Sequence, residues 1–149
     1  MLRDMMKSNT HRVDYLNFKS AGTNGSFAIY VRGCLNEGQS YCSAAKRRLF
    51  ICLDYVRRTM EEKKLVAVYM DIYDLENSNI RAFQELEADL RKGMIEKVLF
   101  ADLEEIFKDP VLSDKMLDLI ECVENIEFFD VDGNVFEAKK IPLNQLIGV

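Results

Sequence analysis

An arginine and a cysteine stand two residues apart at the end of the first strongly apolar segment, residues 27–34. An apolar run of this length between glycines predicts a buried strand. The guanidinium of Arg32 can hold a phosphate through paired hydrogen bonds, and the thiolate of Cys34 can act as a nucleophile. Open α/β folds build phosphate-handling sites where such a strand runs into a helix. The alternative is an ordinary first strand with an incidental arginine and a buried cysteine.

The segments that follow predict an α/β fold. Residues 40–64 have helical periodicity, with an apolar face made of Ala45, Leu49, Cys52, Leu53, Val56 and Met60. Apolar runs at 65–70 and 97–101 predict strands, whereas 81–92 and 113–125 predict helices. Asp132-Gly133 between two short apolar segments predicts a C-terminal β-hairpin. This order predicts a three-layer fold with a mostly parallel sheet.

Functional residues of such a sheet are expected at the carboxyl ends of its strands. These ends carry Arg32 and Cys34, then Asp71, then Asp102 with Glu104 and Glu105. The acidic group at 102–109 has two interpretations, a divalent-metal site or a solvated turn before a helix, and the second is favoured. The basic residues of the first helix lie largely off its apolar face, which predicts a solvated surface for Lys46, Arg47, Arg48, Arg57 and Arg58.

Composition predicts one domain, residues 27–149, preceded by a flexible arm at residues 1–26 that ends in a polar, glycine-containing stretch. The net charge of −5 argues against a domain that holds DNA mainly through clustered basic residues. The four cysteines and His11 lack metal-site spacing, so no metal and no cofactor are predicted. Without a membrane-length apolar run or a signal-peptide region, the chain is expected to be cytoplasmic, with no membrane partner.

Residues 27–130 resemble the catalytic domain of the serine recombinases, the resolvase/invertase family. That family opens with Tyr-x-Arg-x-Ser, and Tyr30, Arg32 and Cys34 stand at the matching positions. A family glutamine lies four residues after the serine; Gln39 lies five residues after Cys34. The family next has a strand ending in Tyr-x-Asp, which Asp71 matches within Tyr-Met-Asp.

Two later motifs complete the resemblance. The family opens its next helix with Arg-Pro, and Arg81 stands there before an alanine. The following strand leads into Asp-x-Asp-Arg-x-x-Arg, and the matching stretch, 102–108, ends with Glu105 and Lys108 in the two arginine positions. The resemblance implies a resolvase/flavodoxin-like fold. It also implies partners in DNA, another recombinase subunit or a second copy in a homodimer.

The resemblance further implies site roles. Cys34 takes the nucleophile position, whereas Arg32, Arg81 and Lys108 hold the phosphate. Asp71 is expected to orient the arginines, and the DNA-phosphate contacts fall to the two residues Tyr30 and Gln39.

Three departures bear on activity. A thiolate suits phosphate chemistry poorly, so Cys34 is a weak replacement for serine. Glu105 places a negative charge where an arginine is expected. The interaction energy with a phosphate at about 4 Å then changes from attraction to repulsion by about 8 kcal/mol, for an effective dielectric of about 20. Lys108 keeps the charge of an arginine but loses its paired donors. In addition, residues 138–149 contain Pro142 and predict neither the long helix nor the DNA-reading domain that the family places there.

Three functions therefore stay open. The first is a recombinase-type domain that no longer cleaves DNA and acts as a binding or regulatory module. The second is an active strand-exchange subunit in which Cys34 forms a covalent DNA-phosphate intermediate. The third is a flavodoxin-like or receiver-like binding domain, for which Asp71 and Asp74 are the acidic candidates but no lysine is well placed.

Overall fold

The computed structural model describes residues 10–35, 42–76 and 78–136. A six-stranded sheet with the order β1-β3-β2-β4-β5-β6 forms its centre. The parallel strands are β2 (Phe27–Cys34), β3 (Leu65–Tyr73), β4 (Lys97–Phe100) and β5 (Glu127–Asp130). Two antiparallel strands close the edges, β1 (His11–Tyr15) against β3 and β6 (Val135–Phe136) against β5. The predicted α/β fold, mostly parallel sheet and terminal hairpin are thus confirmed.

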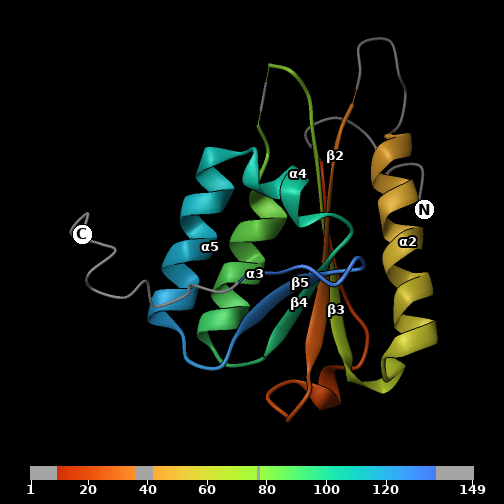
Figure 1. Cartoon of the computed structure of the whole chain (residues 1–149), viewed down its shortest axis with the longest axis vertical. Coiled ribbons are helices and arrows are strands. Elements are labelled where there is room, and N and C mark those ends of the chain that lie inside the picture. The colour runs from red at the N-terminus through yellow and green to blue at the C-terminus, as the bar shows by residue number, and fades with distance from the viewer. Residues whose placement is uncertain (1–9, 36–41, 77, 137–149) are drawn as a thin grey trace.

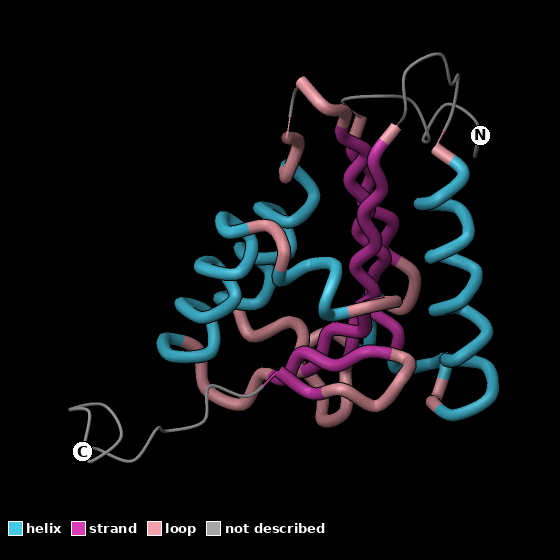
Figure 2. Tube along the Cα trace, turned by 45° about the horizontal axis from the view of Figure 1, so that its top comes forward, coloured by secondary structure: helices cyan, strands magenta, loops and turns pink. Residues whose placement is uncertain are grey.

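Helices cover both faces of this sheet (Figure 1). One face carries α2 (Ser43–Thr59), and the other carries α3 (Arg81–Arg91), α4 (Leu103–Phe107) and α5 (Pro110–Cys122). Short 3-10 turns, η1 (Phe18–Ser20) and η2 (Glu62–Lys64), lie at the opposite end from the strand carboxyl ends. Figure 2 shows the strands seen partly along the sheet, with the helical layers to either side.

Each face of the sheet has its own apolar core. On the α2 side, Ala45, Leu49, Cys52 and Val56 are buried at helical spacing, as predicted. The other core is larger and contains most of the buried aromatic side chains, among them Tyr30, Tyr69, Phe83, Phe100 and Phe128. Because helices pack on both faces, the strands read as continuous apolar runs rather than alternating ones.

The predicted flexible arm is partly wrong, because residues 11–15 form β1. Val13 packs against the larger core, whereas the half-buried Arg12 and Asp14 on either side of it lie on the opposite face of the strand, in the period of two that a strand requires. The hydroxyls of Tyr15 and Tyr69 both donate to one carboxylate oxygen of Asp89 at 2.6 Å, which anchors the edge strand to α3. Burial, with help from Asp89, raises the pKa of Tyr15 to about 12. Residues 1–9 lie outside the described part of the chain.

The last long helix also begins earlier than predicted. It runs from Pro110 to Cys122 rather than over the predicted 113–125, and Asp109 is its N-cap. Proline is well suited to the first turn because its missing N–H has no partner there in any case. The Asp109 carboxylate accepts hydrogen bonds from the N–H groups of Val111 and Leu112, at 3.0 and 3.3 Å.

Gly33 sets how closely α2 approaches β2. A Cβ built on this residue would lie 2.5 Å from the sulfur of Cys42 and 2.8 Å from both the N and the Cβ of Ala45. We expect Gly33→Ala to lower the free energy of unfolding by about 2 kcal/mol, because the first turn of α2 must move outward. Urea unfolding checks this. Gly133→Ala shows the separate cost of backbone strain, since a Cβ there meets no atom within 4 Å although its φ is +87°, whereas Gly33 has no positive φ. A loss below about 0.5 kcal/mol in Gly33→Ala would refute the packing argument.

Candidate functional site

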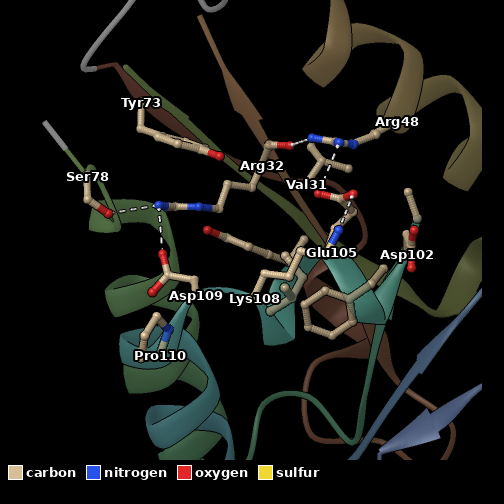
Figure 3. Close-up of a pocket in the computed structure, with 14 residues that line it drawn as sticks. Val31, Arg32, Arg48, Tyr73, Ser78, Asp102, Glu105, Lys108, Asp109 and Pro110 are labelled. Atoms are coloured by element: carbon tan, nitrogen blue, oxygen red, sulfur yellow. Dashed lines mark hydrogen bonds and ion pairs between the residues drawn. The ribbon is translucent and has the colours of Figure 1, made fainter. Parts of the chain in front are cut away.

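A cleft of about 510 Å³ opens at the carboxyl end of β2. The strands β2 and β4 are neighbours, but the chain leaves β2 toward β3 and leaves β4 toward β5, on opposite sides, which is the arrangement that opens a crevice in α/β sheets. The pairing of β2 with β4 ends at Ile29, so β2 continues past its neighbour toward α4 and α5. The side chains that line the cleft come from β2, α2, the end of β3 and the segment from β4 to α5 (Figure 3).

Arg32 lies at the centre of the cleft and is 6% exposed. Its guanidinium donates to the carbonyl oxygen of Asn79, to the hydroxyl of Ser78 at 2.9 Å and to the carboxylate of Asp109 at 3.2 Å. The ring of Tyr73 lies against it, with 4.0 Å between the guanidinium carbon and the ring centroid. Protein groups therefore already satisfy much of the hydrogen-bonding capacity of this arginine (Figure 3).

Asp109 has two roles at once. One carboxylate oxygen caps α5, and the other pairs with Arg32. The cap fixes the carboxylate in place, so the ion pair does not depend on a freely moving side chain. An arriving phosphate has to compete with this carboxylate for Arg32.

Glu105 lies in the same cleft, between two other cations. Its carboxylate is 3.9 Å from the guanidinium of Arg48 and 3.5 Å from the ammonium of Lys108. Arg48 also donates to the backbone carbonyl of Arg32 at 2.7 Å. Among the described residues, the basic side chains that line the cleft are Arg32, Arg48 and Lys108, and each has a carboxylate partner within 4 Å.

The predicted solvation of Arg48 is therefore wrong: its side chain is 26% exposed and points into the cleft. The sequence carried a signal for this, because Arg48 is three residues after Ala45 and four before Cys52, both on the buried face. Arg48 therefore lies at the edge of the apolar face of α2, from where its long side chain reaches the carboxyl end of β2.

Asp71 does not orient the arginines through hydrogen bonds, in contrast to its predicted role. Its buried carboxylate accepts from the N–H groups of Ala82 and Phe83, at 2.8 and 3.0 Å, and from the Tyr30 hydroxyl at 2.8 Å. It therefore holds the N-terminus of α3 against β3. Burial raises the pKa of Asp71, an effect opposed by these hydrogen bonds and by the charge of Arg32.

Tyr30 lines the floor of the cleft, but its hydroxyl is committed to Asp71. Burial and the neighbouring carboxylate raise its pKa well above the ordinary value of 10.0. The hydroxyl thus stays protonated and acts as a donor at neutral pH.

The remaining predicted residues are not gathered at the cleft. Cys34 is half-buried beyond Arg32 on β2, level with Tyr73 of β3, and is not among the lining residues. Arg81 is exposed at the first position of α3 and does not line the cleft either. Gln39 lies outside the described residues. The structure thus brings together Tyr30, Arg32 and Lys108 with Glu105, without Cys34 or Arg81.

The acidic residues at 102–109 include two helix caps. Asp102 caps α4 and Asp109 caps α5, whereas Glu104 and Glu105 lie in the first turn of α4, where the helix dipole favours negative charge. Within the described ranges, no three His, Cys, Asp or Glu side chains are grouped closely enough to hold a metal ion. In the same ranges, no helix combines the length and apolar character needed to span a bilayer.

Comparison with known proteins gives no match. Neither the protein-family models, nor the curated proteins, nor the solved structures include a significant counterpart of this chain. The cleft is therefore interpreted from its own geometry.

Proposed function

We propose that this chain is a resolvase-type recombinase domain that has lost DNA cleavage and acts as a binding or regulatory module in DNA recombination. One observation carries the proposal: Arg32, the arginine of the first motif, is held by Asp109, Ser78 and Asn79. In a cleaving enzyme this guanidinium has to be available to the phosphate, because charge stabilisation by preorganised donors is a large part of catalysis.

The electrostatics of the cleft support the same proposal. Three cations face Asp102, Glu105 and Asp109, so the formal charges of the lining side chains that the structure describes cancel. A neutral cleft attracts a phosphodiester much less than an arginine cluster does. The proposed partners are DNA, contacted weakly or through another protein, and a recombinase subunit.

An active subunit that uses Cys34 is the second candidate. Strand alternation places Cys34 on the same sheet face as Arg32, with one residue between them. In that mechanism the Cys34 thiol loses its proton, its sulfur attacks phosphorus, and a sulfur–phosphorus bond forms as the phosphorus–oxygen bond to deoxyribose breaks. The deoxyribose oxygen takes up the released proton and leaves as a hydroxyl.

We expect no covalent protein–DNA complex when the protein is incubated with supercoiled plasmids or with duplexes that carry a nick to trap the intermediate. Denaturing gels with labelled DNA check this, and Cys34→Ala is the control. A covalent complex that forms with the native chain and disappears in Cys34→Ala would refute the loss of cleavage.

Binding is measured separately by fluorescence anisotropy of a labelled duplex, titrated over salt. The proposal expects weak binding at low salt that falls steeply as salt rises, or binding that requires an added recombinase. Absence of binding under both conditions contradicts a role on DNA and leaves a protein-interaction module.

A further inference from the structure

The outer face of α2 carries two large apolar side chains in the middle of a charged helix. Phe50 is 52% exposed and Ile51 is 41% exposed. Together with the side chains around them they line a shallow groove of about 470 Å³ along the helix. In the described structure α2 is the sole long helix on its side of the sheet, so this face points away from the rest of the molecule (Figure 1).

Charges of opposite sign flank the apolar pair. Arg47 lies one turn before it and Asp54 one turn after it, and both belong to the groove. Lys46, the third charged residue of the groove, lies beside the pair, with its ammonium 5.9 Å from the centre of the Phe50 ring. Asp54 pairs with Arg58 at 2.9 Å, while Arg58 stays 69% exposed and Asp54 58% exposed. Such an exposed pair is weak and exchanges readily for another partner.

This arrangement is complementary to itself under two-fold symmetry. Two α2 helices can pack antiparallel about a two-fold axis that passes at the level between Phe50 and Ile51. Each residue of one helix then lies level with a residue of the other helix, and the two residue numbers add to 101. Arg47 of one copy then lies level with the partner's Asp54, and the same contact recurs about 10 Å further along, from a rise of about 1.5 Å per residue. An isologous interface repeats every contact in this way.

The apolar side chains meet at the centre of the same arrangement. Phe50 and Ile51 stand on the two sides of the line through Arg47 and Asp54, since each residue turns the helix by about 100°. Because the two-fold axis keeps each side chain on its own side of the interface, Phe50 of one copy lies near Phe50 of the other, and Ile51 lies near Ile51. The interface then has an apolar centre flanked by two ion pairs, the usual pattern of a protein contact.

We propose that the outer face of α2, made of Arg47, Phe50, Ile51 and Asp54, is the interface through which two copies of this chain form an antiparallel homodimer. This inference is independent of the proposed function, because Arg48 and the cleft lie on a different side of α2. A single helix face covers less than the roughly 800 Å² per partner of a standard interface, so the dimer is a weak one.

The test is a charge swap read out by sedimentation equilibrium of the full chain over a wide concentration range. We expect the native protein to approach dimer mass at high concentration. Arg47→Asp or Asp54→Arg alone places like charges opposite each other twice and is expected to weaken association at least tenfold. The double variant Arg47→Asp/Asp54→Arg restores opposite charges and is expected to recover dimerisation.

Lys92→Asp is the matched control, since Lys92 is exposed at the end of α3 on the other side of the sheet and undergoes the same charge change. It is expected to leave association unchanged, and circular dichroism confirms that each variant is folded. A protein that is monomeric at every concentration overturns the proposal. A dimer that neither single reversal weakens, or that the double variant does not recover, overturns it as well.

Discussion

Replacing Asp71 by alanine is expected to lower the free energy of unfolding by about 4 kcal/mol, as measured by urea denaturation. The carboxylate is fully buried and accepts three hydrogen bonds, from the N–H groups of Ala82 and Phe83 and from the Tyr30 hydroxyl. Its removal leaves these three donors without a partner in the protein interior. Each unsatisfied buried group costs about 1–3 kcal/mol, so the sum lies at the upper end of single-residue effects.

Two control variants separate the contributions. Tyr30→Phe removes one hydrogen bond and is expected to cost about 1–2 kcal/mol. Asp71→Asn keeps the shape of the side chain but presents an NH₂ group to one of its donors, so it is expected to fall between the other two. A loss below 1 kcal/mol in Asp71→Ala would show that the capping of α3 contributes little.

The pH dependence of stability is a further readout of Asp71. Burial raises its pKa in the folded state above 3.8, so the folded protein binds a proton more readily than the unfolded chain does. The contribution of this group to stability is therefore largest at low pH and falls as the pH rises from 3.8 to the folded-state value. Asp71→Asn is expected to remove this decrease in stability. The check is to compare the unfolding free energy of the native protein and of the variant across the same pH range.

Replacing Glu105 by arginine is expected to strengthen DNA binding by about 10- to 30-fold at low salt. The carboxylate is 46% exposed, so its field is screened by water and the interior value of the dielectric does not apply. With an effective dielectric near 80, changing a repulsion into an attraction at about 4 Å amounts to about 2 kcal/mol. The substitution also frees Arg48 and Lys108 from their shared partner. Anisotropy with a labelled duplex measures the change.

Glu104→Arg is the matched control, because it makes the same change of charge one residue away, outside the cleft lining. It is expected to raise affinity by no more than a few-fold, through net charge alone. Glu105→Gln removes the repulsion without adding a cation and is expected to give about half of the effect in free energy. Equal gains from Glu104→Arg and Glu105→Arg would mean that the cleft is not where the phosphate binds.

The sequence was sufficient to predict the architecture because the apolar patterns are long and regular. The runs that became β2 and β3, and the helical spacing of Ala45, Leu49 and Cys52, carry that prediction. It missed β1, since five residues with a single inward apolar side chain, Val13, resemble a polar linker. What holds β1 is its partner β3 and the distant Asp89, and neither is visible in a local window.

The site was harder to predict because its side chains meet through tertiary packing. The position of Arg32 at the carboxyl end of β2 follows from the strand pattern, but its pairing with Asp109 joins residues 77 apart in the chain. Asp71 caps α3 because the start of that helix lies beside the end of β3. The sequence pattern does not show that the two segments are adjacent, so this role could not be predicted. The cleft lining also depends on α4, a helix of five residues that falls below the length where periodicity is informative.

The position of β1 in the sheet has a consequence for synthesis on the ribosome. Among the strands that the structure describes, its one sheet neighbour is β3, and Val13 pairs with Tyr69, which is 56 residues later. At about 5–20 residues per second, the segment waits about 3–11 s before its partner has been made. The strand β1 is therefore synthesised early but takes its place in the sheet late. Because its sequence is mostly polar, the nascent segment exposes little apolar surface until β3 emerges.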